Sequence, residues 1–323
     1  MRTTTAALAT LAALSLTACG GSDEQALTPA SAAGSTPSAA VSPAPSPVPD
    51  AYTTGSDVTT HGAIGGDVKA VRDLLAPAKE GGPVDWEAVR AVFTTGGASV
   101  RGDGTVRTLA TLFPDSAAVP AVEAALGGTS GLSDAARAQQ VDKGMVVILT
   151  EKVIGELEAA QDKAAKGETD PAEGAPHHVD EAYAFFVADG QGPAATADKR
   201  EKAPQLVGKV RAPIVAGLAA AQTAAAAGDA TALAAATART QAAFDHLYYL
   251  AVNRYLGETG EVELAEGGAF YLAIQPRVRA AVPAADTAIT KGLAGGDLAA
   301  AKAALNSDAV FAALGLTAAQ RVG

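Results

Sequence analysis

The sequence predicts an all-α fold, a helical bundle of long and short antiparallel helices that follows a disordered lipoprotein tether. Two alanine-rich runs, residues 207–243 and 280–313, favour helices because alanine is the strongest helix former. Residues 142–166 repeat apolar side chains at helical spacing, and β-branched runs that alternate with polar residues are missing. The sequence therefore offers no pattern from which a sheet would form.

The N-terminus combines a positive charge with a short apolar stretch. Arg2 precedes an apolar run from Ala6 to Leu16, which is too short to span a bilayer. The residues Leu-Thr-Ala-Cys that end at Cys19 resemble the lipobox of bacterial lipoproteins. We therefore expect residues 1–18 to be a signal peptide and Cys19 to carry lipid. The alternative is an ordinary signal peptide followed by a chance cysteine.

Residues 19–56 are rich in Gly, Ser, Ala, Thr and Pro. Such a segment buries too little apolar surface to offset the entropy of ordering it, so we expect a disordered tether. The rest of the chain, residues 57–323, is then expected to form one all-helical domain.

The charge balance excludes some partners. A formal net charge of -11 and the absence of basic clusters argue against nucleic acid. After the N-terminal run no apolar stretch approaches the length of a membrane span. We therefore expect an exported protein in the cell envelope, periplasmic or on the outer surface, held to a membrane only through the lipid on Cys19.

The spacing of apolar residues, together with glycine and aspartate at helix ends, predicts where each helix lies. Long helices are expected at residues 134–166, 203–227 and 230–256, and shorter ones at 66–78, 84–93, 177–188, 262–275 and 297–313. Glycine-rich residues 94–108 are expected to form a loop. The dipeptides Gly66-Asp67, Gly228-Asp229 and Gly296-Asp297 predict helical hairpins, because glycine can end one helix and aspartate can cap the next.

The motifs of several enzyme classes are missing. The only cysteine is the one expected to be lipidated, four histidines provide few bases, and no Gly-x-Ser-x-Gly motif occurs. The glycine-rich loop lacks the phosphate-binding Gly-x-x-x-x-Gly-Lys pattern. We therefore do not expect an enzyme.

One predicted helix start concentrates metal-binding side chains. After Pro176, a single turn holds His177, His178, Asp180 and Glu181. Either histidine can share a helix face with Glu181, at i,i+4 or i,i+3 spacing. This arrangement suits a first-row transition metal, and it suits equally a plain polar helix terminus.

Other donors lie far away along the chain. Asp245 and His246 flank an aromatic stripe, and Glu266 precedes two glycines. Glu151 lies among aliphatic residues, where a carboxylate is costly unless it is paired or bound to metal. Helical bundles build metal sites from such inward-pointing side chains on facing helices. We therefore expect these four residues to join His178 and Glu181 in one metal site.

Three stretches carry a family resemblance. The segments 180–186, 248–255 and 266–271 resemble the low-iron-inducible periplasmic proteins, the Fea-type iron-assimilation proteins of algae with bacterial lipoprotein relatives. The likeness covers roughly residues 60 to 315. It implies an extracytoplasmic protein that binds iron, as Fe(II) or Fe(III), and aids its uptake by an iron transporter. Tyr183 stands where tryptophan is expected to be common in the family.

Two other hypotheses remain open at the level of sequence. A helical binding or scaffold module of the envelope without metal would use the same polar residues as surface and core hydrogen-bonding groups. A ferroxidase with a di-iron centre would need paired Glu-x-x-His motifs on two helices, and the chain has none.

Overall fold

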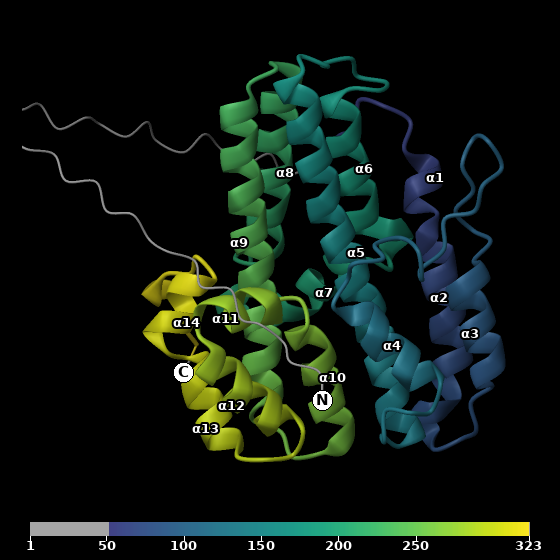
Figure 1. The fold of residues 1–323 in the computed structure, drawn as a ribbon, viewed down its shortest axis with the longest axis vertical. Coiled ribbons are helices and arrows are strands. Elements are labelled where there is room, and N and C mark those ends of the chain that lie inside the picture. Colours follow the sequence, from purple (N-terminus) through teal and green to yellow (C-terminus); the bar gives the residue numbers. More distant parts are fainter. Residues whose placement is uncertain (1–51, 323) are drawn as a thin grey trace, which may run out of the picture. The chain divides into compact units, whose positions relative to one another are not determined.

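A computed structural model describes residues 52–322, and helices form most of this range (Figure 1). Within it there is no β-strand, only an isolated antiparallel bridge between Val100 and Val106. The all-α prediction is therefore confirmed. The predicted signal peptide, the predicted lipidation site Cys19 and residues 19–51 of the predicted tether lie outside the described residues.

The α-helices follow one another in the order α1 Thr59–Gly62, α2 Ile64–Leu75, α3 Trp86–Thr95, α4 Ala118–Leu126, α5 Asp134–Ala165, α6 Ala175–Val187, α7 Pro193–Arg200, α8 Arg211–Ala226, α9 Ala230–Tyr255, α10 Glu261–Tyr271, α11 Gln275–Ala281, α12 Pro283–Leu293, α13 Leu298–Leu305 and α14 Asp308–Ala313. None of these helices is long and apolar enough to cross a membrane.

Helices α5, α6, α8 and α9 pack along one another and form the centre of the fold (Figure 1). The aromatic rings of Phe186 and Phe244 meet between α6 and α9 at 5.9 Å, and both side chains are fully buried. Helix α5 contributes a nearly continuous buried run from Met145 to Leu149. The long helices thus bury the apolar faces that the sequence predicts.

The Gly-Asp dipeptides separate two helices at two of the three predicted places. The Asp229 side chain accepts the Ala232 amide at the start of α9, after Gly228 with φ +65°. Asp297 caps α13 in the same way. The hairpin predicted at Gly66-Asp67 is wrong, because both residues lie inside α2, where buried Asp67 accepts the Ala98 amide at 3.1 Å.

Other differences follow from local breaks in the helices. The helix predicted from residue 203 begins at Arg211, since Pro204 and Gly208, with φ +70°, interrupt the helical path. The predicted 297–313 helix is two helices, because Ser307 caps a new one. Helices α1, α4, α7, α11 and α12 were not predicted; they are short, and all but α12 lie outside the periodic and alanine-rich segments.

Candidate metal centre

Helix α6 carries two candidate metal ligands on one face. Its Val179, Ala182 and Phe186 are buried in the core, which leaves His178 and Glu181 together on an adjacent face. The helix begins after Gly174, and Pro176 in its first turn fits because that position needs no amide hydrogen. The predicted i,i+3 pair is therefore formed, with His178 Nδ1 at 3.1 Å from Glu181 Oε2.

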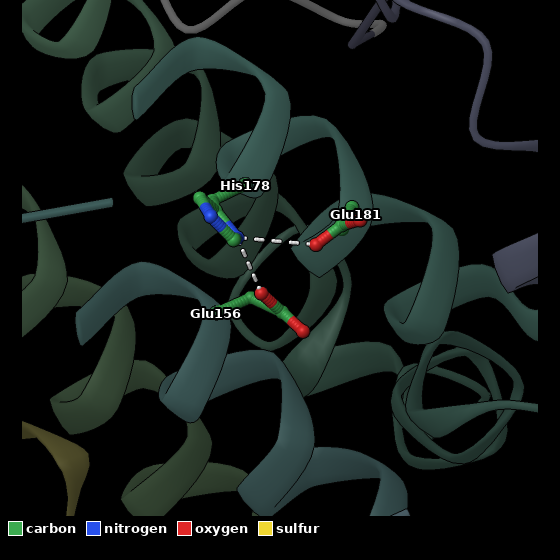
Figure 2. Close-up of side chains that lie close together, drawn as sticks. All are labelled: Glu156, His178 and Glu181. Atoms are coloured by element: carbon green, nitrogen blue, oxygen red, sulfur yellow. Dashed lines mark hydrogen bonds and ion pairs between the residues drawn. The ribbon is translucent and has the colours of Figure 1, made fainter. Parts of the chain in front are cut away.

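A second carboxylate reaches the same histidine from the long helix α5. The Oε2 atom of Glu156 lies 2.8 Å from His178 Nδ1, so this one nitrogen contacts two carboxylates (Figure 2). Glu156 is buried, and Lys152, one turn earlier, pairs with its other oxygen at 2.6 Å. In this geometry the proton on His178 Nδ1 occupies the place that a cation would take between two anions.

Helix α1 brings a further histidine. His61 is buried, and its Nε2 atom lies 2.8 Å from Glu181 Oε1, with the Phe185 ring edge-on at 5.6 Å between centroids. His177 Nε2 lies 3.2 Å from the same oxygen. Three of the four histidines in the chain therefore contact the carboxylate of Glu181.

A hydrogen-bond chain fixes the tautomer of His177. The Ser56 hydroxyl donates to Asp180 Oδ2 at 2.7 Å, so its oxygen must accept from His177 Nδ1, which lies 2.9 Å away. In the neutral ring the Nε2 atom then carries its lone pair, and it faces Glu181. Two acceptors that face each other favour a cation between them, and supporting residues that orient a histidine in this way are typical of metal sites.

The electrostatics of the cluster agree with this geometry. Hydrogen bonds to Glu156 and then to Glu181 raise the pKa of His178 to about 9. Burial opposes ionisation of Glu181, but hydrogen bonds from His178 and His61 outweigh it and hold its pKa far below the usual range. Without a metal the centre is thus a protonated histidine between carboxylates.

The distances from Glu181 to the three histidines are those expected between neighbouring ligands of a metal ion. First-row metals bind nitrogen and oxygen at roughly 2.0 to 2.2 Å, which places neighbouring ligands roughly 3.0 to 3.4 Å apart. The donor pairs at Glu181 are 2.8 to 3.2 Å apart. Among the described residues, the group whose donor atoms all lie within 4.8 Å of one another is Glu156, His178 and Glu181; His61 and His177 contact Glu181 from outside this group. Imidazole and carboxylate donors suit iron, manganese or zinc better than Cu(I).

The cluster opens into a cavity of about 540 Å³. Its wall includes His61, Glu156, His178 and Glu181 together with residues of the predicted 94–108 loop. A ligand can therefore reach the donors.

The structure divides the residues that the sequence predicts as one metal site. His178 and Glu181 come together, whereas the other four lie elsewhere with partners of their own. Asp245 binds Arg277 and accepts Gln241 Nε2 at 2.9 Å, and Glu266 lies 3.5 Å from Lys143. His246 stacks on Tyr249 at 6.5 Å. Glu151 accepts the Ser116 hydroxyl.

The sequence did not predict His61 and Glu156 as members of the cluster. His61 lies in a helix of four residues with no motif around it, 120 positions before Glu181. Glu156 lies on the α5 segment whose apolar spacing was used to predict a helix, and nothing distinguishes it there from Glu151. The signal available was the scarcity of histidine: each of the four in the chain was a candidate donor.

Comparison with known families gives one match. Residues 28–255 match the low iron-inducible periplasmic protein family. The match covers more than two thirds of the chain, since 228 of its 323 residues are included. The chain belongs to this family. The matched residues include every residue of the cluster, whereas the predicted ligand Glu266 lies beyond them. No curated protein and no solved structure matches the chain.

Glu151 provides a test that separates the two carboxylate environments. Burial raises its pKa from 4.5 to about 6. A raised pKa in the folded state stabilises the protein below the unfolded value, and this stability is lost as the pH rises through the folded value. We expect Glu151→Gln to increase the free energy of unfolding by about 1 to 2 kcal/mol at pH 8 and to give no gain at pH 4. Urea unfolding at both values measures this, and a loss of metal binding by the variant would contradict its placement outside the centre.

Proposed function

We propose that this protein binds iron outside the cytoplasm, at the centre formed by His61, Glu156, His177, His178 and Glu181, and assists its uptake. The observation that supports this most directly is the convergence of three histidines on one buried carboxylate, with a second carboxylate beside it. The family description, periplasmic and induced by low iron, makes iron the first metal to test.

The proposed mechanism is reversible binding and transfer rather than catalysis. An incoming metal ion displaces the proton that His178 shares with Glu156 and Glu181. His61 and His177 add neutral imidazole donors, and Ser56 and Asp180 hold His177 in the tautomer that exposes Nε2. Opening toward the cavity gives a route of exit to a transporter. Lipid on Cys19 would keep the protein beside that transporter.

Isothermal titration of the chain with Fe(II) under argon tests this function. We expect one equivalent to bind, and we expect the double variant His61→Ala, His178→Ala to lose at least about 100-fold in affinity, because it removes two ligands. His246→Ala is the matched control, since it removes the fourth histidine, which contacts none of the cluster. Equal binding by the wild type and the double variant would defeat the proposal, and the cluster would then be a closed ion-pair network in a helical scaffold.

A further inference from the structure

The cavity at the metal centre has a basic wall opposite its carboxylates. Arg101, Arg107 and Lys152 line it together with the cluster residues. The Arg101 amide donates to Thr105 and the Arg107 amide donates to Ser99, so the loop folds back on itself and brings both arginines to the opening. The Val100–Val106 bridge joins the two arms of this loop.

These arginines lack the partners that surface arginines usually have. Lys152 pairs with Glu156, but in residues 52–322 no carboxylate lies within ion-pair distance of Arg101 or Arg107. Two guanidinium groups that line one cavity and form no ion pair with a carboxylate there favour an oxyanion, which they bind in a bidentate way.

The charge count does not suit a bare cation. Three basic side chains face the two carboxylates Glu156 and Glu181 in the cavity, so the wall without its histidines carries a net charge of +1. A bare Fe(II) or Fe(III) ion would raise this to +3 or +4 in a partly enclosed space, where like charges repel more strongly than in water. A metal ion that arrives with its own anionic groups avoids this repulsion.

Contacts at His61 point in the same direction. Its Nε2 atom contacts Glu181 at 2.8 Å and also the guanidinium of Arg107. One ring nitrogen cannot donate to the carboxylate and accept from Arg107 at the same time. If a metal bound Nε2, Arg107 would lose this acceptor and, among residues 52–322, would keep only the 3.4 Å contact with Thr60 Oγ1, so its guanidinium would need another acceptor.

The cavity is also larger than an ion requires. A water molecule takes about 30 Å³ of liquid, so six waters around an ion need roughly 180 Å³. The cavity measures about 540 Å³. The remaining space fits an organic chelator of several carboxylate groups.

Resting on the proposed function, we infer that the cargo is a metal ion already complexed by a small polycarboxylate. His61, Glu156, His178 and Glu181 take the open positions on the metal, and the free carboxylate groups of the chelator lie on Arg101 and Arg107. The arginines thus select the complex over the bare ion, and the 94–108 loop acts as the specificity-determining segment.

The test compares two probes on the same variants. Ferric citrate and Fe(II) under argon are each titrated into the wild type, the double variant Arg101→Gln, Arg107→Gln, and the control Arg239→Gln, which removes an exposed arginine on α9. We expect the double variant to bind ferric citrate about 10- to 100-fold more weakly, the loss typical of charge-assisted hydrogen bonds. We expect it to bind Fe(II) at least as tightly as the wild type, because two repelling charges are gone.

Each other outcome overturns the inference. An equal loss for both probes, or no loss for either, shows that the arginines do not select the complex. If bicarbonate added with Fe(II) gives the same arginine-dependent gain as citrate does, a small inorganic anion replaces the polycarboxylate. If citrate alone binds as tightly as ferric citrate, the metal ion does not contribute to binding and the ligand is citrate itself. Fe(II) binding that depends on His61 and His178 while the arginine variant behaves like the wild type leaves the proposed function standing. If the wild type binds neither ferric citrate nor Fe(II), both the inference and the proposed function fail.

Discussion

Glu181→Gln should abolish tight metal binding, with a loss in affinity of at least about 100-fold, more than that usually caused by changing a group that only supports a ligand. Its carboxylate contacts His61 and His177 through one oxygen and His178 through the other. Glutamine keeps the size of the side chain but removes the charge and offers only one oxygen. Titration with Fe(II) under argon measures the affinity.

A second readout of this variant needs no metal. Glu156 and then Glu181 raise the pKa of His178 to about 9 through hydrogen bonds. Glu181→Gln should therefore shift the His178 titration toward its ordinary value, which NMR of the imidazole can follow. Glu266→Gln is the matched control, because Glu266 lies beside Lys143 and outside the cluster. Unchanged Fe(II) affinity in Glu181→Gln would remove this carboxylate from the centre, and an unchanged His178 pKa would refute the geometry itself.

The sequence predicts the long helices well because their signals are local. Ser133 and Asp229 cap α5 and α9 immediately before residues 134 and 230, where the sequence predicts that these helices begin. Gly66-Asp67 shows the limit of such signals, since the same dipeptide lies inside α2. There the contact of Asp67 with Ala98, 31 residues away, replaces the capping role. A long-range contact of this kind leaves no trace in a local pattern.

The candidate centre likewise contains residues that local sequence predicts and residues that only long-range packing brings together. The pair His178 and Glu181 is a property of one helix and can be read from its spacing. His61 and Glu156 join it only because α1 and α5 pack against α6. The expectation that Asp245, His246, Glu266 and Glu151 would converge there assumed that inward-pointing polar groups share one site. The fold instead satisfies several of them locally, with Arg277, Lys143 and Ser116.

The side chain of Asp180 holds residues 52–56 against α6, next to the candidate site. It is fully buried and accepts five hydrogen bonds: from the Tyr52 hydroxyl at 2.8 Å, the Gly55 amide at 2.9 Å, the Ser56 amide at 2.8 Å, the Ser56 hydroxyl at 2.7 Å and Gln222 Nε2 at 3.2 Å. Stacking of Tyr52 on Tyr183 at 4.3 Å closes the same contact. The segment 52–56 is thus bound to α6 next to the histidines.

Asp180→Ala should lower the free energy of unfolding by about 3 to 5 kcal/mol, because it leaves several buried donors without an acceptor. Urea unfolding measures this, and hydrogen exchange at the Gly55 and Ser56 amides should become fast. Asp57→Ala is the matched control: it removes an exposed carboxylate of the same segment and should cost at most about 1 kcal/mol.

The milder Ser56→Ala variant separates stability from function. It keeps most of the Asp180 contacts but removes the acceptor of His177 Nδ1. The His177 ring is then free to change tautomer and to turn Nε2 away from Glu181. We expect Fe(II) affinity to fall by about 10- to 100-fold, as for other supporting groups, while the unfolding midpoint changes little. A drop in stability without a drop in affinity would mean that Ser56 and Asp180 only anchor the segment, and that His177 does not bind the metal.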